Sequence, residues 1–424
     1  MAAPLTDSAP AAFRPLRIAL LGYRSNPFSG GQGIYIRYVA RALRDAGHQV
    51  DVISGAPYPE LDRDIGLIKL PGLNLFETEH PGRALRWRHL KSATDLLEWL
   101  SKMSGGFPEP YTFGRRIVDY FKANPGRYDV IHDNQSLSYG ILKLQKMGLP
   151  VLSTIHHPIT FDRDIALAHE SDWGMRLLIR RWHHFLQMQT RVAKQLKHII
   201  TVSECSKRDL CSAFGVDEDR VEVIVNGVDA DTFRPLPNIV REPRLLITTA
   251  SADQPLKGTQ HLIPAFAQLR ETYPDLHLIF IGKPKPEGTT ARLIEQYNLA
   301  SAITFRHGIS ADTIVQLYAR ATIAVVPSEY EGFGLPAAEA MACAVPVVAT
   351  DGGALPEVVG EAGITVPKSN PTALAEAINS LLKDKERREA LGLRGRHRML
   401  DKFCWSKVAN RLTIYYNQVL DHEP

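Results

Sequence analysis

The stretch SEYEGFGLPAAEAMA carries two glutamates, Glu331 and Glu339, eight residues apart around a Gly-Phe-Gly run. Pro336 is typical of the first position of a helix, because its fixed φ fits there and its missing N–H group costs nothing. Gly332 and Gly334 then fall at a helix N-terminus, where free N–H groups favour an anionic group. The spacing therefore predicts that both carboxylates face one ligand. The alternative is a capped surface helix with scattered acids.

Four further residues could interact with such a ligand. Lys257, in LKGTQHL, starts another predicted helix and offers a point charge, although a solvated lysine is the plainer interpretation. Gly30 and Gly31 open a helix where bare backbone can approach a phosphate or a hydroxyl. His156 ends a predicted strand and suits proton exchange near neutral pH. Its neighbour His157 should point to the opposite side because side chains alternate along a strand.

Metal and dinucleotide sites are the competing interpretations. Three Asp-x-Asp triplets could chelate Mg²⁺, at Asp62/Asp64, Asp162/Asp164 and Asp229/Asp231. Such triplets arise by chance in acidic loops, and local turn hydrogen bonds explain Asp229 better. The loop GGQG lacks the GxGxxG spacing, and Asp51 precedes the second strand rather than following it. We therefore predict neither a metal site nor a dinucleotide cofactor.

The elements that must position these residues alternate between strands and helices. RIALLGY is an apolar run that reads as a buried parallel strand, and the glycine loop, an amphipathic helix and the strand VDVISG follow it. This order opens a doubly wound α/β domain. Further strands are predicted at 129–134, 150–156, 198–203 and 221–227, and a long insertion with helical stretches at about 56–126.

A second α/β series begins after the proline-rich segment RPLPNIVREP, which we interpret as a hinge. Its predicted strands are RLLITTA, LHLIFIG, ITFRHG, ATIAVVPS, PVVATD and GITVP. Two such domains form a cleft, and ligands of doubly wound sheets bind at the carboxyl ends of the strands. The predicted organisation is a disordered lead at 1–15, a first domain at 16–235 that the terminal helix at about 405–424 joins, and a second domain at 236–404.

Bulk composition excludes several classes of protein. The 424 residues carry a net charge of only +4, which gives no electrostatic reason to bind nucleic acid. Four cysteines without a CxxC pair predict a reducing compartment, with no zinc site or disulfide framework. No apolar run is long enough to span a membrane. We expect a cytoplasmic protein.

The segment 172–198 is basic and amphipathic. One interpretation is peripheral contact with an anionic membrane, at which a lipid-linked acceptor would be presented. The other, which we favour, is a helix packed on the core with a solvated basic face.

The opening stretch resembles the Glu-x7-Glu motif of the family 4 glycosyltransferases, which are retaining enzymes of GT-B fold that use nucleotide sugars. Other segments are similar to that family: SGGQGIYIRYVARALRDAGHQVDVISG, TVSECSKRDL, VIVNGVDADTFRP, LKGTQHLIPAF, GGALPEVV and FCWSKVANRL. The resemblance runs from about residue 17 to 420 and is weakest between 57 and 128.

The resemblance implies two Rossmann-like domains facing a central cleft, with the nucleotide sugar bound mainly by the second and a hydroxyl acceptor by the first. It implies that Glu331 contacts the transferred sugar, Glu339 the ribose, Lys257 the diphosphate, and that His156 lies near the reacting sugar. The catalytic positions are then His156, Glu331 and Lys257. The donor-binding positions are Gly30, Gly31, Ser251, Lys257, Gly308, Gly332, Phe333, Gly334, Leu335 and Glu339. The resemblance implies no metal or cofactor.

One position departs from the family pattern. An arginine usually precedes the lysine by five or six residues, and Ser251 or Ala252 stands there in this chain. Either Arg306 or Lys283 replaces it, or Ser251 and backbone N–H groups bind the diphosphate. Other functions on this fold are a nucleotide-sugar 2-epimerase or hydrolase and a non-catalytic nucleotide-sugar or glycan-binding protein. A pyridoxal-phosphate phosphorylase is less favoured, because nothing marks a Schiff-base lysine.

Overall fold

The computed structural model describes residues 14–27, 31–75, 78, 80–168 and 170–422. The chain forms two compact units. Unit 1 runs to Val202 and includes Ser206–Ile224 and the chain from Ser406 on, and unit 2 comprises Ser203–Cys205 and Val225–Trp405. Each unit contains one parallel sheet, which confirms the predicted doubly wound α/β class. The predicted disordered lead lies outside the described residues up to residue 13.

Unit 1 has a seven-stranded sheet in the order β3-β2-β1-β4-β5-β6-β7. Its strands are β1 (Arg17–Gly22), β2 (Gln49–Ser54), β3 (Gly66–Lys69), β4 (Val130–Asn134), β5 (Val151–Ile155), β6 (Ile199–Thr201) and β7 (Val221–Val223). The edge strand β3 pairs with β2 inside the segment predicted as a helical insertion, so that prediction missed a strand. The reason is that β3 is short and none of its residues is buried, which leaves no clear apolar pattern.

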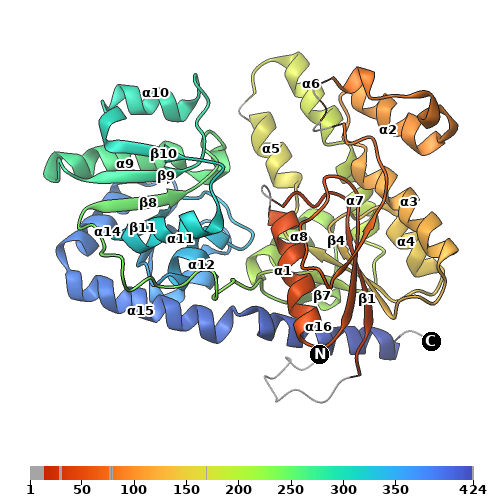
Figure 1. Ribbon diagram of the computed structural model, residues 1–424. Helices are drawn as coiled ribbons and strands as arrows, with labels where there is room; N and C mark the ends of the chain where they lie inside the picture. The colour runs from red at the N-terminus through yellow and green to blue at the C-terminus, as the bar shows by residue number, and fades with distance from the viewer. Residues whose placement is uncertain (1–13, 28–30, 76–77, 79, 169, 423–424) are drawn as a thin grey trace. The chain divides into compact units, whose positions relative to one another are not determined.

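Helices cover both faces of this sheet (Figure 1). They are α1 (Gly31–Asp45), α2 (Ala93–Met103), α3 (Glu109–Ala123), α4 (Tyr139–Lys146), α5 (Thr160–Ala168), α6 (Trp173–Trp182), α7 (Phe185–Ala193), α8 (Glu204–Phe214) and α16 (Trp405–His422). Apolar residues of α3, α4, α7 and α8 pack with β1, β4 and β5 in one core. On α16, Tyr416 Oη lies 2.7 Å from Nδ1 of the buried His132 on β4. The terminal helix is thus bonded to the sheet of unit 1.

Unit 2 has a six-stranded sheet in the order β10-β9-β8-β11-β12-β13. Its strands are β8 (Leu245–Thr249), β9 (His277–Ile281), β10 (Ile303–Arg306), β11 (Ile323–Val326), β12 (Val347–Thr350) and β13 (Ile364–Val366). Its helices are α9 (Thr259–Thr272), α10 (Thr289–Gln296), α11 (Ala311–Arg320), α12 (Leu335–Ala342), α13 (Leu355–Val359), α14 (Pro371–Lys383) and α15 (Lys385–Lys402). Residues of α9 and α14 supply much of the core against β8, β9 and β11.

The segment 172–198 differs from the single stretch that its composition indicated. It forms two helices, α6 and α7, joined at residues 183 and 184. The favoured interpretation holds for α7, whose Leu186, Val192 and neighbours are buried in unit 1, whereas no residue of α6 is buried. In the part of the chain that the structure describes, no helix is both long and apolar enough to cross a membrane.

Candidate functional site

Most of the predicted site residues of unit 2 follow the carboxyl ends of its strands. Ser251 follows β8, Lys283 follows β9, Gly308 follows β10 and Glu331 follows β11. Because all strand pairs in this sheet are parallel, these ends lie on one edge. That edge is where doubly wound sheets bind their ligands.

Two of the loops on this edge are held together by backbone contacts. Gly258, which follows Lys257, has φ +64°, and a Cβ there would lie 1.7 Å from the carbonyl oxygen of Pro327. Only glycine fits both this left-handed conformation and this close approach. Beside it, the N–H of Glu329 donates to the carbonyl of Leu256 at 2.8 Å. The lysine loop is therefore fixed against the loop that carries Glu331.

The fixed loops bring Lys257 and Glu331 into contact. Lys257 Nζ lies 2.7 Å from Glu331 Oε1, and the hydroxyl of Ser328 donates to the same oxygen at 2.8 Å. Glu331 is only 9% exposed, and its Oε2 has no hydrogen-bond partner among the described residues. One carboxylate oxygen is thus anchored while the other can accept a further hydrogen bond. Sequence reasoning did not identify Ser328, although it belongs to the same motif.

The glycines of the motif shape the start of α12. Gly334 is the N-cap with φ 101°, a conformation that favours glycine, and Pro336 occupies the second helical position rather than the predicted first. Leu335 is the first helical residue, and the difference is harmless because the second N–H of a helix also lacks an intrahelical partner. Phe333 is buried with its ring 5.7 Å from that of Phe403. Gly332 accepts a 2.9 Å hydrogen bond at its carbonyl from Ser203, which also belongs to unit 2.

Glu339 lies in the middle of α12 and is half-buried. Burial raises the pKa of its carboxyl to about 8. Near neutral pH the side chain is therefore mainly protonated, so it can donate one hydrogen bond and accept others. A pair of neighbouring hydroxyls, as on a ribose, matches this donor and acceptor set.

Ser251 and Ala252 stand where the family pattern has an arginine. Ser251 is exposed, and Asp253 has a positive φ of 63°. The Asp253 carboxylate accepts hydrogen bonds from the N–H groups of Lys285 and Thr290, at 2.7 and 2.8 Å. Lys283 and Arg306, the predicted replacements, are both exposed at the ends of their strands. Lys283 and Arg306 therefore both lie at the edge of the sheet that is formed by the carboxyl ends of the strands.

In unit 1, His156 is oriented by Asn134, a residue that the sequence did not single out. Asn134 Nδ2 donates to the carbonyl of Gln32 at 3.0 Å, which leaves its Oδ1 to accept from His156 Nε2 at 2.7 Å. Burial lowers the pKa of His156 to about 3, so the imidazole is neutral with its proton on Nε2. Nδ1 has no partner in the described parts of the chain. His156 is therefore prepared to accept a hydrogen bond at Nδ1, which narrows the proton exchange that the sequence suggested.

The loop after β4 also fixes the backbone at the end of β5. Gln135, with φ 54°, accepts from the His156 N–H at 2.7 Å and donates to the His157 carbonyl at 2.8 Å. His157 Nε2 lies 3.2 Å from Asp162 Oδ2, so the two histidines have different side-chain neighbours. Gly31 is exposed at the first position of α1, and a Cβ there would meet nothing within 4 Å. Gly30 lies outside the described residues.

Among the residues that the structure describes, no group of three or more His, Cys, Asp or Glu side chains could hold a metal ion. The aspartates of the predicted alternatives have local partners. Asp62 pairs with Arg41 at 2.8 Å, and Asp229 accepts from the Thr232 hydroxyl at 2.7 Å.

Comparison with known proteins gives matches across the chain. Residues 232–398 match the protein-family model of Glycosyl transferases group 1. Residues 29–232 match the protein-family model of Glycosyltransferase Family 4. The chain is 41% identical to MMP alpha-(1->4)-mannosyltransferase of Mycolicibacterium hassiacum, over 96% of this chain and 98% of that protein. It is 28% identical to D-inositol 3-phosphate glycosyltransferase of Acidothermus cellulolyticus, over 97% and 92%.

Solved structures of similar fold agree with these matches. Sucrose-phosphate synthase from Thermosynechococcus elongatus has a TM-score of 0.72 and 25% identity, covering 96% of this chain and 99% of that one. Anabaena HepE in complex with UDP and glucose has a TM-score of 0.69 and 18% identity, covering 95% and 100%, which shows a likeness of fold.

Proposed function

The chain belongs to the group 1 glycosyl transferases, and from this membership we propose the reaction of its site. It is a glycosyltransferase that uses a nucleotide-sugar donor. We propose that transfer to a hydroxyl acceptor retains the anomeric configuration and needs neither a metal ion nor another cofactor.

The observation that carries this proposal is the ion pair between Lys257 and Glu331. A diphosphate gains charge as the sugar departs, and Lys257 can balance it without a metal. Oε2 of Glu331 can accept a hydroxyl of the transferred sugar and hold it in register. No side-chain nucleophile is needed if the leaving phosphate oxygen takes the acceptor's proton on the same face of the sugar. His156 in unit 1, held neutral by burial, would accept a hydrogen bond from a hydroxyl of a bound sugar.

The relatives of this chain guide the choice of donor. The relative with 41% identity is a mannosyltransferase, so mannosyl nucleotides are the first donors to test. The acceptor in this proposal is a compound with a free hydroxyl group.

The experiment is a thermal-shift panel of UDP, GDP and ADP with their sugar conjugates, with Mg²⁺ or with EDTA, since a ligand of the native state raises its stability. NMR of the anomeric proton then reads the configuration of the product. We expect a shift for one nucleotide sugar that EDTA does not reduce, and a product with the donor's configuration. An inverted anomer would overturn retention, and a shift lost in EDTA would overturn metal independence. Epimer or free sugar formed at full rate without acceptor would overturn transfer.

We also propose that the protein is cytoplasmic and touches an anionic membrane through α6. This helix exposes Trp173 (79%) and Leu177 (58%) beside basic residues such as Arg180, as expected of an interfacial helix. Co-sedimentation with vesicles of phosphatidylcholine and phosphatidylglycerol tests the contact. Trp173→Ala/Leu177→Ala should lose binding, while Trp87→Ala, at a residue 87% exposed outside this segment, should keep it. Equal binding by all variants would refute the role of α6.

A further inference from the structure

The imidazole of His156 has an aromatic neighbour that the reaction described so far does not use. The ring of Tyr35, on α1, lies beside it, with the two ring centroids 4.7 Å apart and the ring planes at 80°. Tyr35 is only 6% exposed, so the contact belongs to the interior of unit 1. Nearly perpendicular rings at such a distance attract one another beyond the effect of burial.

The hydrogen bonds of His156 do not determine the plane of its ring. Asn134 Oδ1 fixes the position of Nε2. The backbone is held by Gln135 and by the hydroxyl of Ser206, which donates to the carbonyl at 3.1 Å. A hydrogen bond to a single ring atom still allows the imidazole to tilt about that atom. The direction of the Nδ1 lone pair therefore depends on what packs against the ring.

Tyr35, which packs there, is supported at its hydroxyl end by a chain of buried polar groups. Tyr35 Oη lies 3.4 Å from Oγ1 of Thr154 on β5. Thr154 Oγ1 lies 2.6 Å from Nε2 of His132 on β4, whose Nδ1 lies 2.7 Å from Oη of Tyr416 on α16. Thr154, His132 and Tyr416 are each at most 1% exposed. The end of the Tyr35 side chain thus contacts a group that is bonded to two further elements.

This support resists displacement because its members would lose their hydrogen-bond partners by moving. Burial lowers the pKa of His132 to about 3, so its ring is neutral and has one donor and one acceptor nitrogen. A shift of Thr154 or Tyr416 would leave one of these nitrogens buried without its partner, which is costly. Tyr35 therefore rests on a fixed surface.

The ring of Tyr35, and not its hydroxyl, is the part in contact with His156. The 3.4 Å separation between Tyr35 Oη and Thr154 Oγ1 exceeds the usual length of about 2.7–2.8 Å for a hydroxyl hydrogen bond, so this contact is weak. A phenylalanine at this position would keep the ring contact with His156, whereas an aliphatic side chain would remove it. The two substitutions therefore separate the effect of the ring from that of the hydroxyl.

We propose that Tyr35 is a positioning residue for the transfer reaction, because its ring sets the plane of the His156 imidazole and so directs the Nδ1 lone pair at a hydroxyl of the bound sugar. This inference rests on the proposed function and adds a residue that acts through His156. Displacement of a positioned group by about 1 Å can cost roughly 100-fold in rate. Turnover should therefore depend on Tyr35, while donor affinity, which we assign to unit 2, should not.

The test compares Tyr35→Leu, which removes the ring, with Tyr35→Phe, which keeps it. Nitrogen-15 NMR of labelled histidine reads the tautomer of His156, whose signals are assigned through His156→Gln. Initial rates are measured with GDP-mannose and UDP-glucose as donors and methyl α-D-mannopyranoside as the acceptor probe. We expect Tyr35→Leu to show a second tautomer of His156 and about 10-fold slower turnover, at an unchanged KM for the donor. Tyr35→Phe should keep one tautomer and a turnover within about twofold of the wild type, since the lost hydroxyl contact is weak.

Phe121→Leu is the matched control, because it removes another buried ring of unit 1. Phe121 lies on α3, is 4% exposed and has ring contacts with Tyr120 and Tyr128. This variant should lose stability, as Tyr35→Leu does, but keep the tautomer of His156 and the turnover. If Tyr35→Leu does not fold, Tyr35→Met replaces it, since a methionine side chain adapts to irregular space.

Two results would overturn the inference. A single tautomer of His156 with full turnover in Tyr35→Leu would mean that Asn134 alone orients the imidazole. Equal losses in Tyr35→Leu and Tyr35→Phe would assign the effect to the hydroxyl.

The thermal shift with nucleotide sugar separates this inference from the proposed function. If the wild type shows neither a donor shift nor transfer, the proposed reaction fails, and the role of Tyr35 in it fails as well. If the wild type transfers sugar and Tyr35→Leu behaves like Phe121→Leu, only the role of Tyr35 fails. The NMR comparison decides whether Tyr35 orients His156 even where the probe sugar accepts no transfer.

Discussion

At the scale of single residues, Glu331 holds two roles that one substitution can separate. Its Oε1 is bonded to Lys257 and Ser328, and its Oε2 is available to a sugar hydroxyl. Glu331→Gln preserves the shape and an acceptor oxygen but removes the charge. We expect nucleotide-sugar affinity to change less than about threefold while turnover falls roughly 100-fold, a loss of about 2.7 kcal/mol in the transition state.

Calorimetry and initial rates of transfer measure the two quantities. The matched control is Glu329→Gln, because Glu329 contacts His261 and Ser369 instead of the Lys257 pair and should keep most of the turnover. If Glu331→Gln weakened donor binding and turnover equally, Glu331 would stabilise the bound donor without any additional stabilisation of the transition state.

His156 offers a second prediction at this scale. Because burial lowers its pKa to about 3, the imidazole should remain neutral, with the proton on Nε2, from pH 8 down to pH 5. Nitrogen-15 NMR of labelled histidine reads both charge and tautomer, with free imidazole as the reference. Asn134→Ala removes the acceptor at 2.7 Å and should allow a mixture of tautomers, with slower transfer at unchanged donor affinity. Protonation of His156 above pH 6 would contradict this account.

At the scale of elements, the close approach of two loops in unit 2 makes a glycine necessary. Gly258→Ala would place a Cβ 1.7 Å from the Pro327 carbonyl and strain a residue at φ +64°. The strain alone costs about 1–2 kcal/mol, and the clash adds to it by displacing Lys257. We expect a lower urea midpoint and a smaller thermal shift with nucleotide sugar.

Gly31→Ala is the comparison, since a Cβ there meets nothing within 4 Å and the residue begins α1. It should leave stability equal or higher by up to about 1 kcal/mol. If Gly258→Ala were equally harmless, the two loops would have to be free to separate.

The elements differ in how well the sequence predicted them. Buried apolar runs such as that of β8 were recognised because a strand covered on both faces has a continuous apolar pattern. The edge strand β3 was missed because it is half-exposed, and α6 was not separated from α7 because both share one basic, amphipathic composition. A local apolar pattern reveals a strand that is buried on both faces, but it does not reveal a half-exposed strand at the edge of the sheet.

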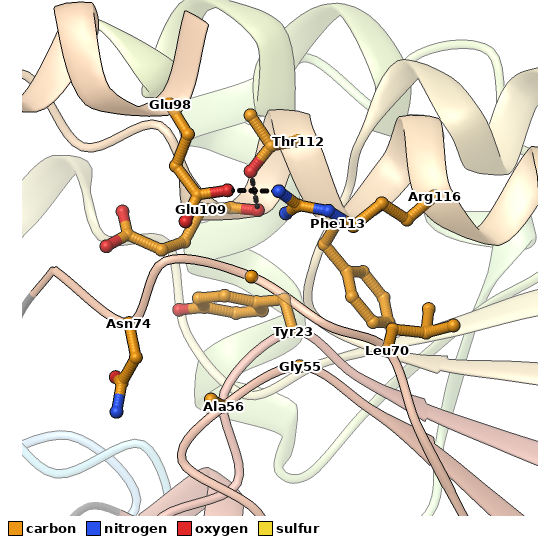
Figure 2. Close-up of a pocket in the computed structure, with 11 residues that line it drawn as sticks. Tyr23, Gly55, Ala56, Leu70, Asn74, Glu98, Glu109, Thr112, Phe113 and Arg116 are labelled. Atoms are coloured by element: carbon orange, nitrogen blue, oxygen red, sulfur yellow. Dashed lines mark hydrogen bonds and ion pairs between the residues drawn. The ribbon is translucent and has the colours of Figure 1, made fainter. Parts of the chain in front are cut away.

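Candidate site residues could be named from separate motifs, but most contacts between them could not. Glu331 and Glu339 come from one motif and one helix, but the contact of Glu331 with Lys257 joins residues 74 apart. Tyr23 and Glu109 come from separate elements yet line one pocket of unit 1 (Figure 2), and nothing near Glu109 in the sequence indicates an unpaired carboxylate. Asn134 likewise looks like an ordinary strand-end residue until the fold places it against His156. Such contacts depend on topology rather than on spacing.

At the scale of the whole molecule, buried titratable groups with opposite shifts determine how stability depends on pH. Burial lowers the pKa of His132 to about 3, below its unfolded value, so this group makes the fold less stable as pH falls below about 6.5. Burial raises the pKa of Glu109 to about 7, above its unfolded value of 4.5. Between these two values the folded state binds the extra proton, so this group makes the fold less stable as pH rises.

Glu109→Gln removes the second contribution and leaves the first. The free energy of unfolding of this variant, relative to the wild type, should therefore rise between pH 4.5 and pH 8, by up to about 3 kcal/mol for the full shift of Glu109. Urea denaturation at both pH values measures this difference, and comparing the two variants at each pH cancels every other titrating group. Glu60→Gln, at an exposed glutamate, should follow the wild type at both pH values. A constant difference between Glu109→Gln and the wild type would mean that the fold already compensates the charge of Glu109, and that its pKa is not raised by burial.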